Sequence, residues 1–126
     1  MFKTVLFPID LSQDNIETTS KAIELIKNYP SNLTLLSVVK HSQDVSNQEL
    51  TISNLKKTQE QIHEANINCD VIERQGEPVF VICNVADNLN VDLIIMGTNG
   101  INLEANDKST PARVIQLVHC PVLVVP

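Results

Sequence analysis

The sequence is poor in aromatic residues and in arginine. Its 126 residues include three phenylalanines, one tyrosine and no tryptophan, and the only arginines are Arg74 and Arg113. The net charge is −6 and the pI is about 4.9. A nucleic-acid-binding protein needs a basic surface for the phosphates, so this composition excludes a nucleic-acid partner. The scarcity of aromatic rings also argues against a flavin site, which needs rings to stack on the isoalloxazine.

Long apolar segments and a cysteine framework are absent as well. No apolar segment approaches the ~18 residues that a membrane span needs. The first residues lack the long apolar core and the small-residue cleavage site of a signal peptide, so we expect a cytoplasmic protein with no membrane partner. The three cysteines, Cys69, Cys83 and Cys120, are odd in number and lack C-x-x-C spacing. We therefore expect buried thiols, with no disulfide framework and no metal site.

The sequence does contain enough apolar material for one folded domain. Hydrophobic residues make up 43% of the chain and charged residues 19%, as in ordinary globular proteins. A chain of this length buries about two-thirds of its surface without help from disulfides or metals. We therefore predict a single domain that covers residues 1–126.

Apolar segments of strand length alternate along the chain with segments of helical periodicity. The predicted strands cover residues 5–9, 33–39, 69–74, 91–96 and 120–125, and the predicted helices cover residues 12–28, 51–65, 78–89 and 110–118. This alternation predicts an α/β fold, with a parallel sheet between two layers of helices. Ser12 is expected to cap the first helix, and Ile52, Leu55 and Ile62 to form the buried stripe of the second. Charged residues in the third strand predict a sheet edge.

A glycine-containing segment follows the fourth predicted strand. The residues Met96-Gly97-Thr98-Asn99-Gly100 come directly after that strand, and Lys108-Ser109-Thr110 precede the last helix. Glycines let a backbone approach a ligand closely, and a helix N-terminus presents free N–H groups, so these residues can form a phosphate cradle. They also fit an ordinary β–α turn with an Asn-Gly corner. The spacing leaves both interpretations open.

Four segments together resemble the universal stress protein family. They are residues 5–12 (VLFPIDLS), 76–78 (GEP), 91–100 (VDLIIMGTNG) and 120–126 (CPVLVVP). These segments keep the family's order, and the likeness as a whole extends over nearly the whole chain. The resemblance implies a Rossmann-like three-layer sandwich, with four helices and a five-stranded parallel sheet of order 3-2-1-4-5. That order places the first and fourth strands side by side.

The resemblance also implies an adenine-nucleotide site. Asp10 corresponds to the position that meets adenosine, Val39 to the residue beside adenine, and Gly97 and Gly100 to the start of a phosphate loop. The implied site residues are Pro8, Ile9, Asp10, Val39, Met96, Gly97, Gly100, Lys108, Ser109 and Thr110. The implied ligand is ATP or another adenine nucleotide, with or without Mg²⁺. For Asp10, a role in capping the first helix fits the sequence equally well.

The phosphate loop departs from the family pattern. Lys108 stands where the family has a glycine, and the loop is two residues shorter. A side chain at this position restricts the loop, whereas its ammonium group can pair with a phosphate or point into solvent. Pro111 removes one backbone donor from the first turn of the last helix.

No arrangement of residues indicates enzymatic turnover, so we expect slow ATP hydrolysis at most. One hypothesis is a non-catalytic stress-response or regulatory dimer that binds an adenine nucleotide. The alternative is a nucleotide-free dimerisation or scaffold module of the same fold. A phospho-receiver domain shares the topology but needs an aspartate at the end of the third strand, where this chain has Arg74-Gln75-Gly76.

The last strand predicts how two copies of the chain associate. Residues Val122–Val125 carry no charge, and in the implied order they form an edge of the sheet. An exposed apolar edge favours pairing with another strand, so we predict a homodimer formed by antiparallel pairing of two copies. The alternative is that the chain's own loops or its last helix cover this edge.

Overall fold

The computed structural model describes residues 2–39, 48–98 and 110–126. Strands and helices alternate along this part of the chain, as the sequence predicts. The strands are β1 (Thr4–Ile9), β2 (Asn32–Val39), β3 (Asn68–Gln75), β4 (Leu93–Gly97) and β5 (Val122–Val125). The helices are α1 (Ile16–Ile26), α2 (Gln48–Glu64), α3 (Pro78–Asn88) and α4 (Thr110–Leu117).

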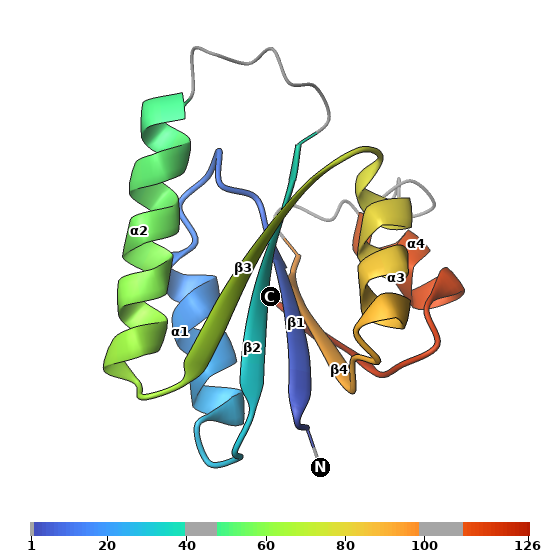
Figure 1. Ribbon diagram of the computed structural model, residues 1–126, viewed down its shortest axis with the longest axis horizontal. Helices are drawn as coiled ribbons and strands as arrows, with labels where there is room; N and C mark the ends of the chain where they lie inside the picture. Colours follow the sequence, from blue (N-terminus) through green and yellow to red (C-terminus); the bar gives the residue numbers. More distant parts are fainter. Residues whose placement is uncertain (1, 40–47, 99–109) are drawn as a thin grey trace.

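The five strands form one parallel sheet in the order β3-β2-β1-β4-β5. Helices α1 and α2 cover one face of the sheet, and α3 and α4 cover the other (Figure 1). The predicted fold class and strand order are therefore confirmed. The charged strand β3 lies at one edge, as predicted, and β5 lies at the other.

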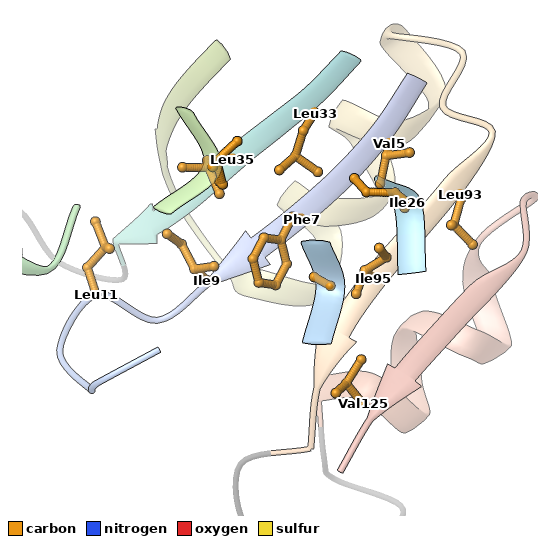
Figure 2. Packing of buried hydrophobic residues seen from close by; sticks show 12 residues of the cluster. Val5, Phe7, Ile9, Leu11, Ile26, Leu33, Leu35, Leu93, Ile95 and Val125 are labelled. Atoms are coloured by element: carbon orange, nitrogen blue, oxygen red, sulfur yellow. The ribbon is translucent and has the colours of Figure 1, made fainter. Parts of the chain in front are cut away.

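The two faces of the sheet pack against separate apolar clusters. Val5, Phe7 and Ile9 of β1 point to the α1 and α2 side, whereas Leu6 packs with the residues on the α3 and α4 side. Figure 2 shows the first cluster as a continuous layer from Leu11 to Val125. Because both faces of the inner strands are covered, their sequences are nearly unbroken apolar segments.

Three predictions about side chains are wrong. Ser12 does not cap α1: the helix begins at Ile16, with Asn15 at the N-cap. Ile52 is 67% exposed, because the buried positions of α2 are Asn54, Thr58 and Ile62, at a spacing of four residues. The three cysteines are only partly buried, because they lie at the margins of the apolar clusters.

None of the helices that the structure describes is long and apolar enough to cross a membrane. Pro78 occupies the first turn of α3, as predicted, where its missing N–H has no partner to lose.

Candidate functional site

The candidate site lies at the carboxyl ends of β1 and β4, which are neighbours at the centre of the sheet. The chain runs from β1 outward to β2 and β3, and then returns to β4 on the other side of β1. In such sheets the ligand crevice lies at the point where the strand order reverses. The carboxyl ends of β1, β2 and β4 all point to the same end of the molecule (Figure 1).

The pairing of β1 with β4 ends before the strands do. The paired residues are Val5 with Leu93 and Leu6 with Ile94, whereas β1 pairs with β2 as far as Ile9. The ends of β1 and β4 therefore lie side by side without a shared ladder at their last residues.

Pro8 explains why that ladder stops. The backbone N–H of Asp92 donates to the carbonyl oxygen of Thr4 at 2.8 Å, so Thr4 presents its backbone to β4. Along a strand, the backbone N–H and C=O groups of successive residues point alternately to its two neighbouring strands. Pro8 is an even number of residues after Thr4, so its backbone faces β4 as well. Proline has no N–H to donate, and the next hydrogen bond between the two strands cannot form.

Asp10 closes the turn that follows β1. Its Oδ1 accepts hydrogen bonds from the backbone N–H of Ser12 at 3.0 Å and from the Ser12 hydroxyl at 2.6 Å. Its backbone oxygen accepts from the N–H of Gln13 at 3.2 Å. Asp10 therefore does not cap α1. It is exposed, and a carboxylate has further acceptor positions for the hydroxyl or amino groups of a ligand.

Two buried amides, which were not among the site residues predicted from the sequence, hold this turn. Asn15 Nδ2 donates to the carbonyl oxygens of Asp10 at 2.8 Å and Gln13 at 3.0 Å. Asn54 Nδ2, on α2, donates to the carbonyl oxygens of Leu11 at 2.8 Å and Gln13 at 3.1 Å. The sequence offered one signal for Asn54: an amide side chain at a position whose helical spacing is that of buried residues.

The other predicted site residues differ in their surroundings. Ile9 and Met96 are buried in the two apolar clusters, Ile9 on the α1 and α2 side and Met96 on the α3 and α4 side. Val39 is half-buried at the end of β2, and its carbonyl oxygen accepts from the N–H of Gly76 at 3.0 Å. Gly97 ends β4, and Thr110 begins α4. The remaining three lie outside the described residues: Gly100, Lys108 and Ser109.

A separate cavity of about 230 Å³ lies at the other end of the sheet, next to the residues that precede β4 and β5. Its lining includes Asp87, Val91, His119 and Cys120, and His119 Nδ1 lies 3.4 Å from Asp87 Oδ1. Burial, and then the charge of Asp87, raise the pKa of the Cys120 thiol, which disfavours a thiolate nucleophile. In the part of the chain described, no three His, Cys, Asp or Glu side chains are grouped to hold a metal ion.

Comparisons of the sequence agree on one family. The family model described as the Universal stress protein family matches residues 1–126. Universal stress protein Sll1654 of Synechocystis is 41% identical over 136 residues, which cover 100% of this chain and 87% of the relative. Universal stress protein YxiE of Bacillus subtilis is 29% identical and covers 99% of both chains.

Solved structures share the fold. A universal stress protein in complex with cAMP superposes with a TM-score of 0.81 at 18% identity, covering 98% of this chain and 97% of the other. A universal stress protein family protein from Arabidopsis thaliana with AMP bound gives 0.71 at 18% identity, covering 98% and 90%. At this identity the likeness concerns the fold.

Proposed function

Because this chain belongs to the universal stress protein family, we propose that it is a non-catalytic stress-response protein that binds an adenine nucleotide. The proposed site spans the carboxyl ends of β1 and β4, and the proposed ligand is ATP, with or without Mg²⁺. Two structural relatives, one in complex with cAMP and one with AMP bound, support the ligand class.

The observation that carries this proposal is the arrangement at the switch point of the sheet. The ladder between β1 and β4 stops at Leu6 and Ile94, and the turn closed by Asp10 lies directly beyond it. Ligands of open α/β sheets bind at this point. Here the chain presents an exposed carboxylate next to strands whose ends are not tied together.

Each part of the nucleotide has a partner of suitable chemistry in the proposed site. The Asp10 carboxylate accepts hydrogen bonds from adenosine. Val39, half-buried at the end of β2, supplies an apolar wall for the base. Gly97 has no side chain to separate the backbone from a phosphate, and Lys108 supplies a positive charge.

Binding to purified protein tests the proposal. We expect chromatography after acid release to detect an adenine nucleotide, and titration calorimetry to measure binding of ATP with Mg²⁺. Gly97→Val places a branched side chain at the end of β4 and should weaken binding at least tenfold, about 1.4 kcal/mol. Equal affinities of wild type and Gly97→Val would remove the proposed site.

The role of Lys108 is tested by comparing ATP with adenosine. If its ammonium pairs with a phosphate, Lys108→Gly weakens ATP binding and leaves adenosine binding unchanged. A gain in ATP affinity would show that the lysine side chain blocks the loop.

The second candidate function is a nucleotide-free dimerisation module. The uncharged edge strand β5 and the lysine at the glycine position of the loop favour it. Failure of wild-type protein to bind ATP, AMP and cAMP, together with a dimeric mass, would establish this function in place of the first.

A further inference from the structure

One buried side chain connects α2 to the turn after β1. Asn54 is 8% exposed. Its Nδ2 donates to the carbonyl oxygens of Leu11 at 2.8 Å and of Gln13 at 3.1 Å. These contacts link residues that are 43 and 41 positions apart in the sequence.

Packing alone does not explain an asparagine at this position. Asn54 shares the buried face of α2 with Ile62, which packs in the apolar cluster. A buried amide is costly unless it is hydrogen-bonded, and a leucine, whose side chain has the same branching and no polar atom, avoids that cost. What the amide adds is a pair of directional bonds to two carbonyl oxygens of one turn.

Thr58 provides a comparison on the same helix face. It lies one turn after Asn54, is 3% exposed, and donates its hydroxyl to the backbone oxygen of Asn54 at 2.9 Å. That hydrogen bond stays within α2. Asn54 is therefore the buried polar residue of this face whose side chain reaches the turn, among those described.

We propose that Asn54 is a positioning residue for the adenosine half of the nucleotide site, an inference that rests on the proposed function. It acts through the turn and does not contact the ligand. By holding the carbonyl oxygens of Leu11 and Gln13, it fixes the path of the backbone on which the Asp10 carboxylate and the Ser12 N–H meet at 3.0 Å. Asn15 also holds this turn, because its side-chain amide donates to the carbonyl oxygens of Asp10 and Gln13.

Amide hydrogen exchange tests the effect on the turn without any ligand. Asn54→Leu keeps the branched shape of the side chain and removes both donors, so the Ser12 and Gln13 amides should exchange roughly tenfold faster. Thr58→Val is the matched control, since it removes a buried hydroxyl from the same face without touching the turn. Unchanged exchange of both amides in Asn54→Leu would overturn the proposal.

Ligand titration tests the effect on the site. Asn54→Leu should weaken binding of adenosine and of ATP by the same factor, roughly tenfold, and Thr58→Val should leave both unchanged. A loss confined to ATP, or an equal loss in Thr58→Val, would overturn the proposal. Should Asn54→Leu fail to fold, Asn54→Ala replaces it, because alanine removes both donors without adding bulk or charge.

The two readouts separate this inference from the function on which it rests. If wild-type protein binds no adenine nucleotide, the proposed function fails. Faster amide exchange in Asn54→Leu would then show that Asn54 stabilises the turn and has no role in ligand binding. If wild type binds and Asn54→Leu binds equally well, the site stands and the positioning role is wrong.

Discussion

At Gly76 the backbone takes a conformation that residues with a side chain rarely adopt. Its φ is +148°, and a Cβ built there would lie 2.9 Å from Val81 Cγ2. The residue lies between the end of β3 and Pro78, the first residue of α3. The glycine therefore permits both the turn and the close approach of α3.

We predict that Gly76→Ala lowers the free energy of unfolding by about 1–3 kcal/mol, because strain and the short contact with Val81 add. Urea unfolding followed by circular dichroism measures this change. Gln75→Ala, at an exposed neighbouring position, should change the value by less than about 0.5 kcal/mol. Equal stability of wild type and Gly76→Ala would contradict the role assigned to this glycine.

Pro8 interrupts the ladder between β1 and β4 because it has no backbone N–H to donate. Pro8→Ala restores the N–H that faces β4, so the ladder between β1 and β4 can grow by one hydrogen bond. The added bond contributes about 1 kcal/mol, and the gain in unfolded-state entropy costs a similar amount. We therefore expect nearly unchanged stability in denaturant unfolding.

The same substitution is expected to weaken nucleotide binding by roughly threefold or more, because it ties together the strand ends at which the ligand is proposed to bind. Titration calorimetry with ATP checks this. Equal affinities of wild type and Pro8→Ala would show that the break in the ladder has no part in the site.

At the scale of elements, the two edges of the sheet differ in character. β3 carries Asp70, Glu73 and Arg74 and is largely exposed. β5 carries no charge, and Val122, Leu123 and Val124 are half-buried. Charge protects an edge against pairing with another strand, so β5 is the edge at which a second copy would pair.

We predict that wild-type protein is a dimer with twice the 14.0 kDa mass of one chain, and that Val124→Lys shifts it toward monomer. The lysine keeps the backbone donor and places a charge in the proposed contact. Size exclusion with light scattering measures the mass. Val71→Lys, on the edge strand β3 where the side chain is 37% exposed, is the matched control and should leave the mass unchanged. A monomeric wild type at tens of micromolar would refute dimerisation.

At the scale of the whole molecule, the three layers bury the thiols enough to disfavour their charge. Burial, and then the charge of Asp70, raise the pKa of Cys69 to about 11 from a usual 9.0. Burial and nearby carboxylates also raise the pKa values of Cys83 and Cys120. The thiols therefore stay protonated at neutral pH.

Stability should consequently fall in alkali. Between about pH 9 and pH 11 the unfolded chain loses the Cys69 proton while the folded chain keeps it, so the unfolded state binds fewer protons and becomes favoured as pH rises. Urea unfolding across this range measures the loss. Cys69→Ser, which carries no ionisable thiol, should show a shallower decline, and an identical decline would contradict the raised pKa.

The sequence alone predicted the features of this protein that depend on interactions between nearby residues. Alternating strand and helix periodicity predicted the order of elements, and charges on residues 69–74 predicted the edge at β3. Pro78 predicted the start of α3. These features follow from the local backbone and from whether each face is buried, so they leave a pattern in consecutive residues. The adjacency of β1 and β4 came from the family resemblance, because no local pattern encodes it.

Only the tertiary structure decided how the site is held. Asn54 reaches Leu11 across 43 residues, Asp10 bonds Ser12 although a helix cap fitted the sequence equally well, and Ile52 faces solvent because α2 buries its other side. Each outcome depends on which surface of an element meets its neighbours. Packing between distant segments decides which surface is buried. The residues involved show no periodicity along the sequence from which this could be predicted.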